Sequence, residues 1–180
     1  INSISGSFQA YSYYKERINF CKNFEESNLF NDLIIRMHAK RFWNEEYLFK
    51  TQMPKINIDR GYQSIFKLIK KSKLVIHSYV GTGYLETLSM NLPTIVFTNL
   101  RDCLLKKDVI DDLKVLADEN IFHESYQSAA TFLKENYNNI NEWWYDDKTQ
   151  NARIYFCKKH AMENKNKLND IIKIFNSNLV

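Results

Sequence analysis

The stretch from residue 72 to residue 99, SKLVIHSYVGTGYLETLSMNLPTIVFTN, most constrains how this chain can fold. Lys73–Ile76 is a short apolar run typical of a buried strand, and His77–Gly83 is a turn that holds two of the four glycines. Tyr84–Asn91 places leucines at helical spacing, and Thr94–Phe97 has the pattern of a second buried strand. Strand, turn, helix and strand form a βαβ unit, from which parallel sheets are built.

The turn and the helix start predict an anion-binding site. The first N–H groups of a helix have no partner within the helix and carry a partial positive charge, which favours anions. Gly81 and Gly83 lack a Cβ and let the backbone approach a phosphate closely, while Thr82 can cap the helix or donate its hydroxyl. Glu86 lies about one turn further along, where a carboxylate can reach two neighbouring hydroxyls such as those of a ribose.

Two residues at the end of the first strand join this hypothesis. His77 and Ser78 close the strand, and a histidine there can donate a hydrogen bond to a phosphate or serve the structure alone. The simpler interpretation is that the glycines belong to an ordinary βαβ loop and that Glu86 is a solvated helix residue. The motif is neither the dinucleotide fingerprint, because the third glycine is missing, nor a P-loop, because no Gly-Lys-Ser/Thr follows.

A basic cluster follows another apolar run, Leu33–Met37. In open α/β sheets, ligands lie beyond the carboxyl ends of the strands, so Arg36 and His38 are expected near the same crevice. There they would stabilise the negative charge that develops on a leaving nucleotide, and they are the candidate catalytic residues. A solvated basic loop, with Lys40 and Arg41 in it, is the alternative.

The remaining segments extend the α/β pattern. We expect a Rossmann-like parallel sheet with helices on both faces and a helical C-terminal extension. A polar stretch over Ile1–Tyr11 is expected to be a linker or the entry to a strand, Pro93 is expected to end the central helix, and Ile65, Leu68 and Ile69 are expected to face the core. Further expected elements are the helices Tyr13–Glu26, Tyr62–Lys71, Val109–Ala117, Tyr126–Tyr137 capped by Ser125, Thr149–Ala161 and Glu163–Phe175, and the strands Leu33–Met37 (buried), Lys55–Asp59 and Ile121–Phe122.

Composition narrows the class of protein. The 180 residues are 44% hydrophobic and 14% aromatic, which fits one folded domain with a sizeable core. The net charge of +4 suits a small anionic ligand, and we see no basic stripe of the kind that binds nucleic acid. No apolar run approaches the ~20 residues of a membrane span. Three widely spaced cysteines predict reduced thiols in the cytoplasm and no zinc site.

Particular motifs resemble a known fold family. Leu85-Glu86-Thr87-Leu88, with Pro93 seven residues after Glu86 and an apolar strand following, looks like the donor-site segment of GT-B glycosyltransferases. The whole chain is also similar to a family of transferases of bacterial surface-carbohydrate biosynthesis. The pieces that match in order are Gly6-Ser7-Phe8, residues 33–38, 55–59, 64–72, 81–97 and 121–125, Trp143-Trp144, Ala152-Arg153 and Phe156-Cys157.

The resemblance implies a function and its partners. Residues 1–180 would be a single nucleotide-sugar-binding domain, the C-terminal half of a two-domain glycosyltransferase whose N-terminal half supplies the catalytic base. Glu86 would hold the ribose, the turn at Gly81, Thr82 and Gly83 would face the diphosphate, and His38 matches a histidine of the family. The partners would be a nucleotide-sugar and a glycan or lipid-linked acceptor. No metal or other cofactor is expected, and the location would be the cytoplasm or the inner face of the membrane.

Three other functions fit the same pattern. A GT-B-fold sugar epimerase would bind the same donor without an acceptor. A glycerophosphotransferase-like enzyme would prefer a CDP-linked donor. A non-catalytic interaction module would bind no nucleotide.

Overall fold

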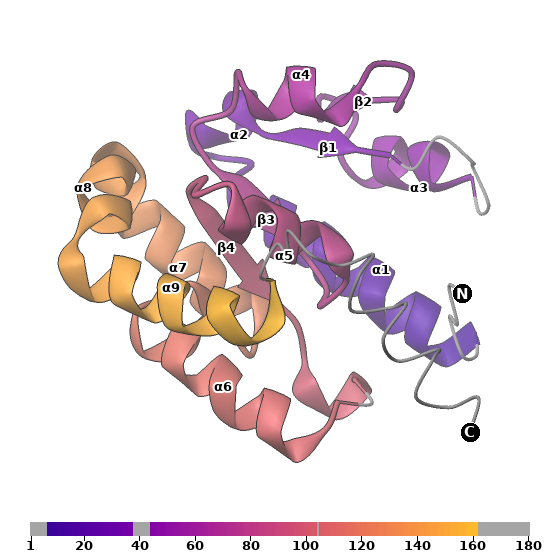
Figure 1. Cartoon of the computed structure of the whole chain (residues 1–180). Helices are drawn as coiled ribbons and strands as arrows, with labels where there is room; N and C mark the ends of the chain where they lie inside the picture. The colour runs from indigo at the N-terminus through magenta and orange to yellow at the C-terminus, as the bar shows by residue number, and fades with distance from the viewer. Residues whose placement is uncertain (1–6, 38–43, 104, 162–180) are drawn as a thin grey trace.

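The computed structural model describes residues 7–37, 44–103 and 105–161 (Figure 1). Short strands alternate with helices through the first two thirds of this part of the chain, and helices follow. The strands are β1 (Ile34–Arg36), β2 (Asn57–Asp59), β3 (Val75–His77), β4 (Thr94–Phe97) and β5 (Phe122–His123). The helices are α1 (Ser7–Lys22), α2 (Leu29–Asp32), α3 (Glu45–Gln52), α4 (Ile65–Ile69), α5 (Thr82–Ser89), α6 (Lys107–Asp118), α7 (Tyr126–Asn136), α8 (Ile140–Tyr145) and α9 (Asp147–His160), with 3₁₀ turns η1 (Leu100–Asp102) and η2 (Tyr137–Asn139).

All described strands pair in parallel, in two sheets. One sheet has the order β3-β4-β5 and the other consists of β1 and β2. Helices connect each neighbouring pair, as a parallel crossover requires. Ile35 of β1, Ile58 of β2 and Ile76 of β3 pack against the same buried cluster, so both sheets share one core. The predicted Rossmann-like α/β class is confirmed, although its strands form two hydrogen-bonded groups.

The central strand β4 shows why helices cover both faces. All four of its residues are buried, and successive side chains of a strand point to opposite faces. Ile95 and Phe97 join the cluster that includes α1 and α7, whereas Val96 joins the cluster that includes α5, α6 and α9. A strand buried on both faces has a nearly continuous apolar run, here the three apolar residues after Thr94, which is why β4 was recognisable from the sequence.

The N-terminal part differs from the sequence prediction. Helix α1 begins at Ser7, within the segment expected to be a linker or a strand entry, and ends at Lys22. Strand β1 is at the edge of its sheet, and Ile34 is 48% exposed, so the prediction of a fully buried strand was wrong. An edge strand of three residues cannot be enclosed as β4 is, because it pairs with a single neighbouring strand and packs against the core on one face.

Helix α4 is shorter than predicted. It has five residues, and only Ile69 of them is buried. Ile65 is 42% exposed, so its expected place in the core was wrong. Helical spacing marks which residues share a face, but it does not show how far that face extends over the core.

The end of α5 has a different cause from the one predicted. The helix ends at Ser89, and Asn91 then adopts a left-handed conformation with φ of 54°. Asparagine tolerates this conformation, and Leu92 N–H returns to the carbonyl of Thr87 at 3.0 Å. Pro93 lies beyond the helix, and its carbonyl accepts a hydrogen bond from Val75 N–H in the β3–β4 ladder.

The C-terminal helices confirm the expected extension. Ser125 caps α7, because its side chain accepts a hydrogen bond from Ser128 N–H. Trp144 of α8 is fully buried. The helix predicted over Glu163–Phe175 lies outside the described residues.

Candidate functional site

The candidate site is the amino end of α5, where β3 delivers the chain into the turn. Gly81 is the N-cap residue, and no side chain of the described residues caps the first N–H groups of the helix. Its backbone is extended, with φ of −126°, a conformation that any residue adopts. The missing Cβ of glycine therefore matters here because of the space that it leaves. A Cβ at Gly81 would lie 2.3 Å from Cε2 of Tyr79, because the tyrosine ring rests directly on the glycine.

Two side chains on the exposed face of α5 are free for a ligand. Thr82, the first residue of the helix, and Glu86, four residues later, are both exposed. Residues four apart lie on the same side of a helix. Among the described residues, no hydrogen bond or ion pair engages the Glu86 carboxylate. A hydroxyl and an acid therefore line the side of α5 that its buried residues Tyr84, Thr87 and Leu88 leave open.

His77 lies beneath the helix start. The Thr87 hydroxyl donates to the carbonyl of Tyr84 at 3.1 Å, so it accepts from His77 Nε2–H, which is 3.0 Å from Thr87 Oγ1. The other edge of the ring faces Gly83, where an added Cβ would lie 3.3 Å from Cε1. Burial lowers the pKa of His77 from its ordinary value of 6.5 to about 4, so the ring is neutral near pH 7.

This arrangement bears on the predicted phosphate contact. In the tautomer that the hydrogen bonds require, Nε2–H is already engaged and Nδ1 is an acceptor. A contact between His77 and a phosphate, which stays a prediction, would need the ring to change tautomer. What the structure shows is a ring that holds the turn against α5.

Helix α1 also reaches the site, which the sequence reasoning missed. Ser78 donates its hydroxyl to Tyr13 Oη at 3.2 Å, and the rings of Tyr13 and Tyr79 meet edge to face at 5.6 Å. Burial raises the pKa of Tyr13, so this hydroxyl stays protonated. The cluster of tyrosines in the sequence Tyr11-Ser12-Tyr13-Tyr14 was the available signal, but their contact with residue 78 is set by the tertiary fold.

The far end of α5 is fixed by the C-terminal helices. Arg153 Nη1 donates to the carbonyl of Leu88 at 3.0 Å, which places a cation at the negative end of the helix. Trp144 Nε1 donates to Asn91, 3.0 Å from its side-chain oxygen. Helix α5 is therefore held firmly at its carboxyl end while its amino end faces the turn.

Arg36, a candidate catalytic residue, is engaged within the protein. It forms an ion pair with Asp59, its partner in the β1–β2 register, and its Nη2 donates to the carbonyl of Gln63 at 2.7 Å. The guanidinium thus joins the two strands and the loop before α4. His38, with Lys40 and Arg41, lies outside the described residues, so the structure does not place the other candidate.

Another cluster of charged side chains lies away from α5. The Asp112 carboxylate of α6 accepts from Lys159 Nζ at 2.6 Å, from His160 Nε2 at 2.8 Å and from the hydroxyl of Tyr155 at 3.0 Å. These hydrogen bonds lower the pKa of Asp112 to about 2. Every donor comes from α9, so the cluster fastens α9 to α6.

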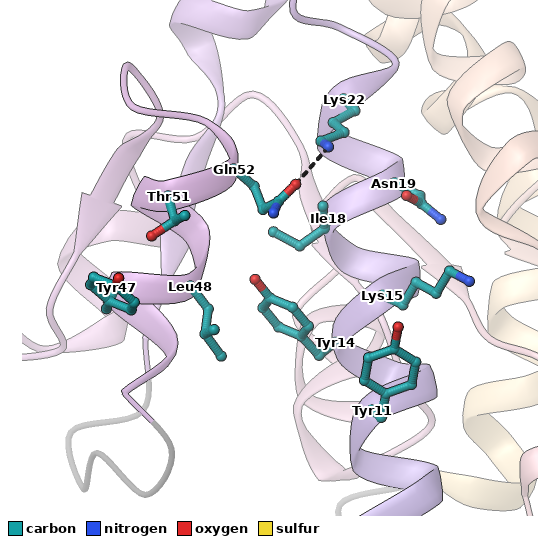
Figure 2. A pocket seen from close by; sticks show the side chains of 10 residues that line it. All are labelled: Tyr11, Tyr14, Lys15, Ile18, Asn19, Lys22, Tyr47, Leu48, Thr51 and Gln52. Atoms are coloured by element: carbon teal, nitrogen blue, oxygen red, sulfur yellow. Dashed lines mark hydrogen bonds between the residues drawn. The ribbon is translucent and has the colours of Figure 1, made fainter.

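Two hollows in the described surface also lie elsewhere. One, of about 330 Å³, lies between α1 and α3, where the tyrosine rings and the Lys22–Gln52 hydrogen bond can be seen in Figure 2. The other, of about 550 Å³, is lined by residues 25–28, Phe30, Asn31, Pro54 and Lys55. Neither contains a residue predicted for the site.

Two further properties of the described residues concern metal ions and membranes. No group of three or more histidine, cysteine, aspartate or glutamate side chains in that part of the chain is placed to hold a metal ion. No described helix combines the length and apolar character that crossing a bilayer demands.

These features define a Rossmann-like α/β protein, a class in which ligands bind beyond the carboxyl ends of the strands. A family model described as LIC12162 family transferase matches residues 1–175, and the chain therefore belongs to this family of transferases. No curated protein and no solved structure matches it.

Proposed function

We propose that this transferase uses the amino end of α5 to bind a nucleotide-sugar and that the group transferred is a sugar. The observation that carries the proposal is the open face of α5, on which Thr82 and the unengaged Glu86 carboxylate lie one turn apart. The family membership supports group transfer in general. The sugar, its nucleotide and a role in surface-carbohydrate synthesis come from the GT-B resemblance and belong to the proposal.

Each residue of the site has a distinct role in this proposal. The N–H groups of the first turn, with Thr82 Oγ1, receive the diphosphate, and Glu86 accepts hydrogen bonds from the ribose hydroxyls. Gly81 admits the diphosphate once the half-exposed Tyr79 ring moves aside. His77 and Ser78 hold the turn from below and from the side.

The charge that develops on the leaving nucleotide needs further stabilisation. His38 is the proposed group for this, and Arg36 contributes less because Asp59 already balances its charge. A separate N-terminal half would supply the acceptor site and the base. The donor site is proposed to work without a metal, so EDTA should leave nucleotide affinity unchanged.

The decisive experiment measures nucleotide binding by calorimetry with UDP, GDP, CDP and CMP, and then with the 2′-deoxy form of the best ligand. Glu86→Gln should weaken the ribonucleotide by about ten- to a hundredfold, because a hydrogen bond to a charged group contributes roughly 1.5–3 kcal/mol. The same substitution should affect the 2′-deoxynucleotide less, since one of the two hydroxyls that Glu86 would hold is gone.

Glu142→Gln is the matched control, because Glu142 is also an exposed helical acid and lies on α8. It should leave both affinities unchanged. Binding of no nucleotide, or equal losses for the ribo and deoxy ligands with Glu86→Gln, would contradict the proposal. A clear preference for CDP would favour a glycerophosphotransferase-like donor over a sugar donor.

A further inference from the structure

The net charge of the chain is concentrated in one segment. Residues 60–85 contain five basic residues, Arg60, Lys67, Lys70, Lys71 and Lys73, and no acidic residue. The rest of the chain then has 20 basic against 21 acidic residues, which nearly cancel. Basic and acidic residues are thus mixed over most of the chain but not here.

Three of these cations are available at the surface. Lys67, Lys70 and Lys71 are exposed, and none forms an ion pair with any described residue. Arg60, in contrast, pairs with Glu46 at 2.6 Å, and Lys73 lies over the Tyr137 ring at 4.5 Å. The free positive charge therefore belongs to α4 and the residues that directly follow it.

Large apolar side chains are exposed on the same short helix. Phe66 is 50% exposed and Ile65 is 42% exposed, while Tyr62 in the preceding loop is 77% exposed. Phe66 and Lys70 are four residues apart, so they lie on the same side of α4. An aromatic ring beside lysines at a solvent surface is the combination that interfacial membrane segments use.

The protein also holds this surface in place. The loop before α4 is bound by Arg36, which donates to the carbonyl of Gln63 and pairs with Asp59 at the end of β2. Ile69 anchors the helix from below. Figure 1 shows α4 at the upper margin of the molecule, on the outer side of β1 and β2.

From this arrangement we propose that α4 and its flanks, residues 62–71, form a docking surface for an anionic lipid bilayer. Lys67, Lys70 and Lys71 attract the negative headgroups, and Phe66 and Ile65 enter the boundary between headgroups and acyl chains. Charge complementarity selects this partner, because residues 62–71 contain no acid and their three lysines form no ion pair with any described residue. The inference is independent of nucleotide binding at α5.

The test is sedimentation of the protein with vesicles of phosphatidylcholine, alone or mixed with phosphatidylglycerol. Binding should require the anionic lipid and should weaken as salt is added. Replacing Lys67, Lys70 and Lys71 together by glutamine should reduce the partition coefficient on the order of a hundredfold, at about fivefold for each lysine. The combined Ile65→Ser and Phe66→Ser variant should also weaken binding, and circular dichroism checks that both variants fold.

A control variant removes the same number of positive charges from other parts of the surface. Lys106, Lys107 and Lys158 are exposed lysines on other parts of the surface, and replacing them by glutamine should leave vesicle binding nearly unchanged. Equal binding to neutral vesicles, or an equal loss in this control, would overturn the proposal. A second result would also overturn it: heparin, a soluble polyanion, binds as tightly as the vesicles do, and the serine substitutions leave binding unchanged. A nucleic acid or other polyanion would then be the partner.

Discussion

The mostly buried imidazole of His77 gives the sharpest stability prediction. Its pKa is about 4 in the folded protein and near 6.5 when exposed, so the unfolded chain binds a proton more readily. A group with a lowered pKa contributes stability that is fully present above pH 6.5 and is lost as the pH falls toward 4. The difference of about 2.5 between the two pKa values corresponds to about 3 kcal/mol in total, and about 2 kcal/mol of it is lost at about pH 5.

The perturbation is His77→Gln, because glutamine keeps an N–H donor for Thr87 and does not titrate. Urea unfolding followed by circular dichroism would give the free energy of unfolding of both proteins from pH 7 to pH 4. The free energy of unfolding of the variant should be lower than that of the unchanged protein near pH 7. The difference between the two free energies should shrink by about 2 kcal/mol as the pH approaches 5. His123, whose pKa burial also lowers, contributes equally to both proteins and cancels in the comparison.

Parallel curves for the two proteins over this range would refute the reasoning, because the imidazole would then titrate alike in the folded and unfolded chains. A nuclear magnetic resonance titration of the ring would give the same pKa directly. A folded-state pKa near 6.5 would show that the ring is not enclosed between Thr87 and Gly83.

Three substitutions test other contacts by the same unfolding assay. Gly81→Ala should destabilise the fold by less than ~1 kcal/mol, because the half-exposed Tyr79 ring can turn away from the new Cβ, and adding Tyr79→Ala should remove that loss; a larger loss would mean that the ring is held in place. Trp144→Phe should cost ~1–3 kcal/mol, because it removes the N–H that holds Asn91 at the end of α5, and an unchanged midpoint would argue against that hydrogen bond. Ser125→Ala should cost ~0.5–2 kcal/mol through loss of the α7 cap, whereas Ser125→Gly should cost only a few tenths; equal losses would contradict the capping role.

The acid-free segment around α4 was visible in the sequence, but its meaning was not. The charged residues of segment 60–85 can be counted without a structure. The spacing of Ile65, Leu68 and Ile69, however, suggested that these apolar residues face the core. Only the fold shows that α4 is short and marginal, so that Ile65 and Phe66 reach solvent beside the lysines.

What the sequence determined by itself is the βαβ unit around α5. Strand β4 has the predicted bounds, Thr94–Phe97, because burial on both faces favours a nearly continuous apolar run. The Ser125 cap was equally predictable, since a cap depends only on residues within one turn. The composition and spacing of a few neighbouring residues decide such features.

What only the tertiary structure decided are the contacts between distant segments. Arg36 meets Asp59 through the register of β1 and β2, and Tyr13 meets Ser78 because α1 packs beside the turn. His77 becomes a neutral, mostly buried ring because it lies between Thr87 and Gly83. Local periodicity specifies which side of an element is apolar, but the partner that covers that side, and with it the charge and hydrogen bonding of each side chain, is fixed by long-range packing.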